Sequence, residues 1–307
     1  MKQMVYQAEL SEDGLRLDQF LKNKSNLTRS EVQRWIKEGR AFLDNGKMIR
    51  SNYHVKPGDR VVFSWDEKEE LSLRPQNIPL DILYEDEDMI VVNKRRGMVV
   101  HPAYGNPDGT LVNALLYHLG GSLLSVCDDP IRPGIVHRLD KDTSGVMAAA
   151  KSQRAFSLLK EQIASHTAQR RYVALVHGQM EGNTGVIRLP LGRSAKDRMK
   201  WAVEPKTGKP AITHYRVIEF MPDFSWIECR LETGRTHQIR VHMAHIRHPV
   251  VNDPLYGWKK DHFPIEGQAL HSHTLDLIHP VTGKRLHFEA PIPEDLKRSL
   301  AIARKHQ

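Results

Sequence analysis

Apolar residues near the start of the chain recur at helical spacing and predict two short helices. The apolar positions are Leu15, Leu17, Phe20 and Leu21 in the first helix, and Val32, Trp35 and Ile36 in the second. Thr28 and Glu31 have the spacing of a capping box, which predicts the start of the second helix. Gly39 is suited to end that helix.

Two strands joined by tight turns are expected after these helices. Residues 41–43 are apolar and precede Asn45-Gly46, while Pro57-Gly58-Asp59 precedes the apolar run 60–63. The pattern predicts a small helix–helix–strand–turn–strand domain with its core at about residues 14–63. Residues 66–81 are acidic and then punctuated by prolines, which is typical of a linker.

Beyond residue 81, strand and helix patterns mix without an internal repeat. Apolar runs predict strands at 90–92, 98–100, 146–150 and 171–177, and helical stripes predict helices at 110–118 and 152–163. A regular alternation of strand and helix, as in a doubly wound sheet, is absent from this pattern. The sequence therefore favours an α+β fold.

The length and composition are those of a globular protein. The 307 residues are enough for two domains, and no apolar run approaches the roughly 18 residues that a membrane span needs. The first ten residues lack the apolar stretch of a signal peptide. Cys127 and Cys229 are too few for a disulfide framework, so we expect a cytoplasmic protein without membrane association.

Positive charge is concentrated near the start of the chain. The net charge is +8, and residues 14–60 hold eleven Lys or Arg against five Asp or Glu, a local +6. The basic residues on and between the two predicted helices are Lys22, Lys24, Arg29, Arg34, Lys37 and Arg40. Such a concentration indicates a polyanion-binding face, although a solvated surface without a partner is the alternative.

The segment RPGIVHRLDKDTSG, residues 132–145, places charged side chains directly after an apolar run. Asp140 is expected on a tight connection between two extended segments, 134–136 and 146–150, whose rigid flanks suit a functional side chain. The alternative is that Asp140 and Asp142 only form turns with nearby backbone amides.

A second polar segment, residues 231–257, leads into a predicted helix at about residue 239. Arg235 and Arg240 near that helix start would attract a carboxylate or a phosphate. A metal site must also be weighed here, because three histidines (His242, His245 and His248) recur every three residues with Asp253 beyond them. Zinc-binding helices place two histidines four residues apart with a glutamate between them, and that pattern is absent, so no metal is expected.

Three blocks in one order carry a resemblance to a known family. They are HRLDKDTSG at residues 137–145, a basic pair before Tyr172, and TGRTHQIRVHM at residues 233–243. With the supporting stretches ILYEDEDMIVVNK, GMVVHP, GTLVNALL, LPLGR and HPVVNDPLYG, the chain from about Ile78 onward resembles the RluA family of pseudouridine synthases. Residues 14–61 resemble the RNA-binding domain first named for ribosomal small-subunit protein four.

The resemblance implies a fold and an activity. The expected fold is a small RNA-binding domain with its linker at residues 1–74, followed by a catalytic domain at residues 75–307 built on a mixed, mostly antiparallel sheet flanked by helices. The expected activity is the isomerisation of uridine to pseudouridine, with 23S ribosomal RNA or the large ribosomal subunit as partner. This reaction exchanges bonds without net redox or hydrolysis, so no cofactor is expected, and a monomer is the default.

The resemblance also implies roles for single residues. Asp140 matches the carboxylate that handles the ribose–base bond, Arg240 its salt-bridge partner, and Tyr172 the residue that packs on the target base. The expected RNA-binding residues are Arg138, which enters the RNA where the base has left, with Arg235, His237, Lys22, Arg29, Arg34, Lys37 and Arg40. Asp140 must be ionised to attack C1′, to add to C6, or to remove a 2′ proton, and the sequence leaves these routes open.

Alternatives to this function stay open at this point. They are a transfer-RNA substrate, a non-catalytic RNA-binding or ribosome-assembly protein, and a hydrolase that uses Asp140 and Asp142. Two departures from the family pattern concern loop geometry or RNA contacts. Residues 94–97 are Lys-Arg-Arg-Gly where the family usually has Lys-Pro-x-Gly, and Asn252 stands where Gly commonly precedes Asp.

Overall fold

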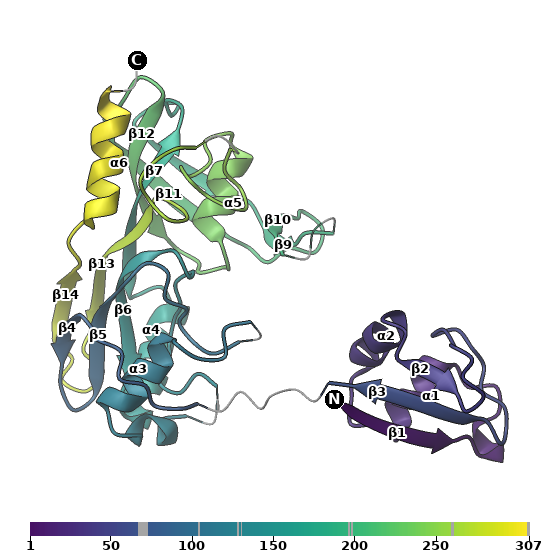
Figure 1. Cartoon of the computed structure of the whole chain (residues 1–307). Helices are drawn as coiled ribbons and strands as arrows, with labels where there is room; N and C mark the ends of the chain where they lie inside the picture. Colours follow the sequence, from purple (N-terminus) through teal and green to yellow (C-terminus); the bar gives the residue numbers. More distant parts are fainter. Residues whose placement is uncertain are drawn as a thin grey trace. The chain divides into compact units, whose positions relative to one another are not determined.

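The chain folds into two compact units, Met1–Glu70 and Leu71–Gln307 (Figure 1). The computed structural model describes residues 1–66, 73–103, 105–127, 129, 131–195, 197, 199–258 and 261–305. Part of the predicted linker, residues 67–72, lies outside the described residues. The predicted boundary between residues 74 and 75 stays a prediction.

The first unit is a three-stranded antiparallel sheet covered by two helices. The elements are β1 (Lys2–Gln7), a 3-10 turn η1 (Leu10–Glu12), α1 (Leu17–Lys24), α2 (Arg29–Lys37), β2 (Ala41–Leu43) and β3 (Arg60–Trp65), with strand order β1-β3-β2. Both helices begin within two residues of their predicted starts, and the backbone N–H of Thr28 donates to the Glu31 carboxylate at 2.8 Å. Gly46 takes the predicted turn with a φ of 80°.

Strand β1 was not predicted from the sequence. It pairs with β3 along its whole length, from Lys2 opposite Trp65 to Gln7 opposite Arg60. All but one of its side chains are exposed, so it lacks the alternation of apolar and polar residues that marks a half-buried strand.

The second unit is built on one nine-stranded sheet, in the order β4-β5-β6-β13-β7-β12-β11-β8, with β14 paired to β13. Its strands are β4 (Ile82–Glu85), β5 (Met89–Lys94), β6 (Ser144–Ala150), β7 (Gln169–His177), β8 (Thr184–Arg188), β11 (Ile212–Phe220), β12 (Phe224–Leu231), β13 (Leu270–Ile278) and β14 (Arg285–Glu289). All pairs are antiparallel except β6 with β13, which confirms the predicted mixed, mostly antiparallel sheet. A separate hairpin, β9 (Leu191–Arg193) with β10 (Trp201–Val203), projects from this unit (Figure 1).

Helices flank the sheet of the second unit. They are α3 (Leu111–His118), η2 (Ser122–Ser125), α4 (Gln153–Ala164), α5 (Gln238–His245) and α6 (Glu294–Lys305). Helix α6 packs with its buried Leu296 and Leu300 on the sheet face that carries Val173, whereas the neighbouring Tyr172 lines a cavity on the other face. None of the helices in the described part of the chain is long and apolar enough to cross a membrane.

One predicted strand of the second unit is wrong, and one predicted extended segment forms no regular strand. Residues 98–100 form no strand, because the carbonyl oxygens of Val99 and Val100 accept from the backbone N–H groups of Leu111 and Val112 in the first turn of α3. Residues 134–136 make only a single bridge, from Ile135 to Ala149. The connection that carries Asp140 is therefore bounded by a regular strand, β6, on one side only.

Candidate active site

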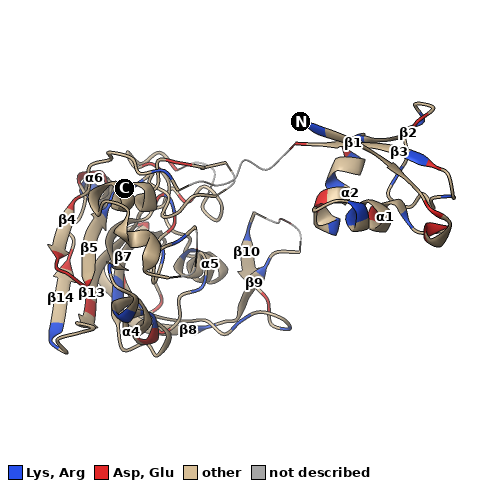
Figure 2. Cartoon of the chain, turned by 90° about the horizontal axis from the view of Figure 1, so that it is seen from below, with Lys and Arg blue, Asp and Glu red and all other residues tan. Residues whose placement is uncertain are grey.

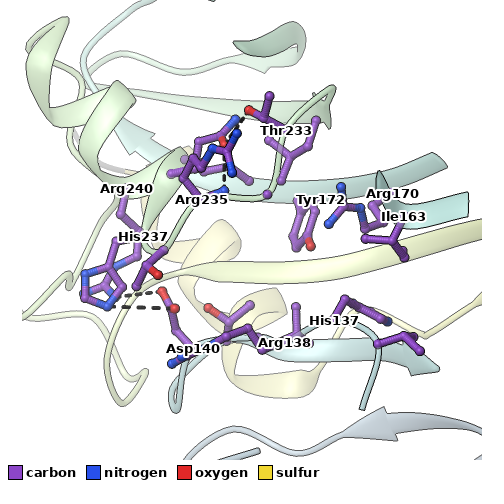
Figure 3. Close-up of a pocket in the computed structure, with 18 of the residues that line it drawn as sticks. His137, Arg138, Asp140, Ile163, Arg170, Tyr172, Thr233, Arg235, His237 and Arg240 are labelled. Carbon is purple, nitrogen blue, oxygen red and sulfur yellow. Dashed lines mark hydrogen bonds and ion pairs between the residues drawn. The ribbon is translucent and has the colours of Figure 1, made fainter. Parts of the chain in front are cut away.

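A cavity of about 500 Å³ opens on the sheet face opposite α6. Its walls come from the segment before β6, from β7, and from the loop that leads into α5 (Figure 3). The structure thus brings together three segments that lie far apart in the sequence. The predicted residues that line this cavity are Arg138, Asp140, Tyr172, Arg235, His237 and Arg240.

Asp140 is held by a chain of charged groups. Its carboxylate accepts a hydrogen bond from Arg240 Nη1 at 2.8 Å, and 16% of its side chain stays exposed to the cavity. Arg240 donates two more bonds, from Nε and Nη2, to the two carboxylate oxygens of Asp253 at 2.7 and 2.8 Å. The bidentate bond fixes the guanidinium plane, and in this orientation one N–H of Nη1 points at Asp140.

The two neighbouring carboxylates, Asp140 and Asp253, keep Arg240 charged. Burial opposes the charge, but the hydrogen bonds and charges of Asp253 and Asp140 raise the pKa of Arg240 above its ordinary value. Asp253 is itself buried and accepts from the backbone N–H groups of Leu255 and Tyr256. The charged guanidinium therefore makes a charge-assisted hydrogen bond to the Asp140 carboxylate.

Asp253 is a site residue that the sequence analysis placed only as a candidate metal ligand. The sequence could have indicated this role, because Asp253 directly follows Asn252 in the polar segment 231–257 that also holds Arg240. Asn252 has a φ of 57°, a conformation that Asn tolerates better than most residues, and its side chain donates to the carbonyl oxygens of Phe263 and Ile265. The departure from Gly at this position is therefore accommodated in the turn.

His237 faces Asp140 from the start of α5. Its Nε2 lies 3.9 Å from Asp140 Oδ1, and its Nδ1 lies 2.9 Å from the hydroxyl of Tyr256. That hydroxyl already accepts from the backbone N–H of Trp201, so its own hydrogen is available to Nδ1. Burial lowers the pKa of His237, although the charge of Asp140 opposes this shift.

Tyr172 forms a wall of the cavity, and Arg138 lies at its edge (Figure 3). Tyr172 is 5% exposed, and burial raises the pKa of its hydroxyl. Arg138 is exposed. The half-buried Arg235 donates from Nε to the Pro210 carbonyl oxygen at 3.1 Å, so part of its guanidinium is used within the protein.

Buried groups hold the loop of Asp140 by its backbone. Lys94 Nζ donates to the carbonyl oxygens of Arg95, Met98 and Lys141 at 3.0, 2.8 and 3.0 Å. Arg96 donates to the carbonyl oxygen of Asp142 and to the carboxylate of Asp295 in α6 at 2.8 Å. Where the family usually has Lys-Pro-x-Gly, the third residue of this motif here ties the loop to the C-terminal helix.

The predicted RNA-binding residues of the first unit lie on and directly after α1 and α2, where the ribbon of Figure 2 is coloured blue at basic residues. Lys22 and Lys37 are exposed and make no hydrogen bond or ion pair with any described residue. Arg29 pairs with the buried Asp18 at 3.0 Å, and Arg40 pairs with Asp66 at 3.0 Å. Part of the charge and hydrogen-bonding capacity of these two arginines is therefore used within the first unit.

The histidine series of α5 does not gather around an ion site. His242 Nδ1 lies 2.9 Å from Thr213 Oγ1, and its Nε2 lies 2.9 Å from the Leu189 carbonyl oxygen. Within the described ranges, the one group with metal-ligand spacing is Asp86, Asp88 and His279, and none of these three residues lines the cavity. Asp86 is already bonded there by Tyr84, by His279 and by backbone N–H groups.

Known proteins share both parts of this architecture. Residues 88–245 match the family model described as RNA pseudouridylate synthase, and residues 15–61 match the S4 domain model. A Bacillus subtilis relative, "Uncharacterized RNA pseudouridine synthase YlyB", is 45% identical over 307 residues and 100% of both chains. A Xanthomonas campestris relative, "Ribosomal large subunit pseudouridine synthase D", is 44% identical over 91% of this chain and 85% of its own.

The chain belongs to the RNA pseudouridine synthase family. The solved structure "Human RNA Pseudouridylate Synthase Domain Containing 1" agrees, with 25% identity and a TM-score of 0.55 over 74% of this chain and 86% of its own. These matches confirm the resemblance to RluA-family enzymes of the RluD-like type, and they confirm an RNA pseudouridine synthase, an isomerase, with RNA as its partner. The non-catalytic alternative is not favoured.

Proposed function

We propose that this pseudouridine synthase modifies specific uridines of large-subunit ribosomal RNA, acting as a monomer in the cytoplasm. The observation that carries the proposal is the charged chain Asp140–Arg240–Asp253 at the wall of a cavity of about 500 Å³, a size that suits a small-molecule ligand or a flipped nucleotide. Near-full-length relatives are named for the large ribosomal subunit, which supports this RNA as substrate.

In this proposal Asp140 is the group that handles the bond between ribose C1′ and uracil N1. Its carboxylate attacks C1′, adds to C6, or removes the 2′ proton. Each route requires the ionised form, which Arg240 supports from 2.8 Å. In this proposal Arg240 acts on Asp140 rather than on the base, because all three of its nitrogens bond to the carboxylates of Asp140 and Asp253.

The base must leave its stack to reach Asp140. Flipping a nucleotide costs a few kcal/mol, and stacking on an aromatic side chain returns about 1–3 kcal/mol. Tyr172 supplies the aromatic face in the cavity, and its protonated hydroxyl is placed to carry a proton. Arg138 at the cavity edge enters the RNA where the base has left, and Arg235 and His237 contact the nucleotides around it.

The test is tritium release from unmodified large-subunit ribosomal RNA that carries 5-tritiated uridine, with a chelator present. A new bond at C5 must expel this tritium, whichever route operates. We expect release by the wild type and background release by Asp140→Asn, which keeps the size of the side chain but removes its charge. Release from transfer RNA alone would refute the ribosomal substrate, and equal release by Asp140→Asn would refute the role of Asp140.

A further inference from the structure

Arg170 is a buried cation without a counter-ion. It lies on β7, is 5% exposed and lines the same cavity as Tyr172. It makes no side-chain hydrogen bond or ion pair with any residue in the described part of the chain, and its Nε is buried without a partner. A buried donor that lacks an acceptor is costly to the fold, which points to a role for the Arg170 side chain in binding a ligand.

The backbone beside Arg170 leaves room for its guanidinium. A side chain at Gly234 would place its Cβ 2.8 Å from Arg170 Nη1, which is too close for ordinary contact. The absence of a side chain at Gly234 thus leaves space for this position of the guanidinium.

A second unpartnered donor lies in the same wall. His137 is 8% exposed and lines the cavity, and its Nε2 accepts from the backbone N–H of Ala148 at 3.0 Å. The neutral ring therefore carries its hydrogen on Nδ1, and this buried atom has no partner among the described residues. Burial, together with the charge of Arg170, lowers the pKa of His137 to about 3, so the ring stays neutral at pH 7.

The position of Arg170 relative to Tyr172 fits a role at the base. Residues two apart on a strand share a face and lie about 7 Å apart, so both side chains reach one cavity (Figure 3). A uracil that stacks on Tyr172 with its ribose at Asp140 would have carbonyl oxygens within reach of the guanidinium. A carbonyl oxygen is a hydrogen-bond acceptor, and an acceptor is what the buried N–H groups of Arg170 and His137 lack.

The isomerisation itself places negative charge on the uracil, beside the cavity wall in which Arg170 has no acceptor. When the C1′–N1 bond breaks, its electron pair stays on uracil and spreads from N1 onto the carbonyl oxygens O2 and O4. When a carboxylate adds to C6 instead, the ring electrons move to O4 as an enolate. The base then forms its bond from C5 to C1′, one proton leaves C5 and one is taken up at N1, so no further reactant is needed.

We propose that Arg170, assisted by the Nδ1–H of His137, binds a carbonyl oxygen of the uracil and stabilises the negative charge on the base during the exchange of its bond to ribose. This role rests on the proposed position of the base between Asp140 and Tyr172. Hydrogen-bond donors that are held in place and point at a developing negative charge stabilise the transition state far more in a site that excludes water than they would in solution. The assignment makes Arg170 a catalytic residue that holds for each of the three routes of Asp140.

The test compares Arg170→Met with Arg171→Met, a control on the same strand whose side chain lines cavities on the opposite sheet face. The measurements are the single-turnover rate at saturating RNA, the RNA Kd and the melting temperature. We expect Arg170→Met to lower the rate by about 10²–10³-fold, the usual loss for one such donor, with Kd close to wild type. Its melting temperature should equal or exceed that of the wild type, because an unpaired buried charge is removed.

The controls separate this role from others. Arg171→Met should match the wild type in rate and Kd, and Arg170→Lys, which keeps the charge, should recover part of the rate. A higher Kd with an unchanged rate would assign Arg170 to an RNA phosphate and overturn the proposal, as would a wild-type rate in Arg170→Met. If Arg170→Met does not fold, Arg170→Gln takes its place with the same expected loss of rate.

These measurements also distinguish an error in the proposed ribosomal substrate from an error in the proposed role of Arg170. An inactive wild type on ribosomal RNA would refute that substrate alone, and the same variants would then be compared on the transfer RNA that the wild type modifies. A loss of rate specific to Arg170 on either RNA supports the role of its guanidinium.

Discussion

Lys94 shows how one buried residue supports the loop of Asp140. Its ammonium group is 1% exposed and donates to three backbone carbonyl oxygens, one of which belongs to Lys141, the residue directly after Asp140. Burial lowers the pKa of Lys94 to about 7, with the charge of Asp142 opposing the shift. The group is therefore partly neutral near pH 7, and a neutral amine has one hydrogen fewer than its three acceptors require.

We expect Lys94→Met to lower the single-turnover rate by about 10²-fold, the loss that follows from misplacing a reacting group by about 1 Å. RNA affinity should change little, because Lys94 is sealed from the surface. The measurement is tritium release at saturating RNA, and circular dichroism checks the fold. Lys160→Met on the exposed face of α4 is the matched control, and equal rates in both variants would contradict the role of Lys94.

The sequence reveals only some of these residues. Asp140, Tyr172 and Arg240 lie within the three blocks that carry the family resemblance, and that resemblance, not the local pattern alone, singled them out. Arg170 stands beside the equally basic Arg171, and only the strand pairing decides that one side chain enters the cavity and the other faces away. The burial of Lys94 depends likewise on Lys141, 47 positions away.

At the scale of elements, Asp18 joins the two helices of the S4 domain. Its buried carboxylate accepts from Arg16 Nε at 3.1 Å, from Arg29 Nε at 3.0 Å and from Gln33 Nε2 at 2.6 Å. The donors come from the residue before α1 and from the first half of α2. Although burial opposes it, these hydrogen bonds lower the pKa of Asp18 to about 2.

We expect Asp18→Asn to destabilise this domain by about 1.5–3 kcal/mol at pH 7, the usual value for hydrogen bonds to a charged group. The folded pKa of about 2 lies below the ordinary Asp value of about 3.9, so the wild type gains this stability above pH 4. The gain is lost as the pH falls from about 4 to 2. Urea unfolding of both proteins across this range measures it, and a difference that does not depend on pH would contradict the role of the charge.

Elements were predictable where a local signal was strong. The helix α2 has its capping box and apolar stripe within a few residues, so its start at Arg29 could be read directly. The run 98–100 has the apolar composition of a strand, but its carbonyl groups bond to the start of α3, a contact that the local pattern does not contain. Strand β1 is exposed and has no periodicity to detect.

At the scale of the whole molecule, the two units have separate cores. The buried apolar cluster of the first unit runs from Ala8 to Trp65, and that of the second from Met89 to Ala303. Residues Leu73, Ile78 and Leu80 pack against the second cluster, so removal of residues 1–66 leaves that core complete. The catalytic unit is therefore expected to fold without the S4 domain.

This separation leads to a prediction about RNA binding. Deletion of residues 1–66 should weaken RNA affinity while the single-turnover rate at saturating RNA stays at the wild-type value, since every residue that lines the cavity remains. Each lost phosphate contact should also lower the slope of log Kd against log salt by about 0.7–0.9. The measurements are Kd at several salt concentrations and tritium release at saturating RNA.

A double variant of the full-length chain, Lys22→Gln with Lys37→Gln, separates charge from shape. Both lysines are exposed and have no partner among the described residues, so their replacement should leave the domain folded. If these lysines contact phosphates, the salt slope should fall by about 1.4–1.8, and the deletion should lower it at least as much. An unchanged slope in the deletion would contradict phosphate binding by the S4 domain, and a lower rate at saturating RNA would mean that this domain also helps to place the uridine.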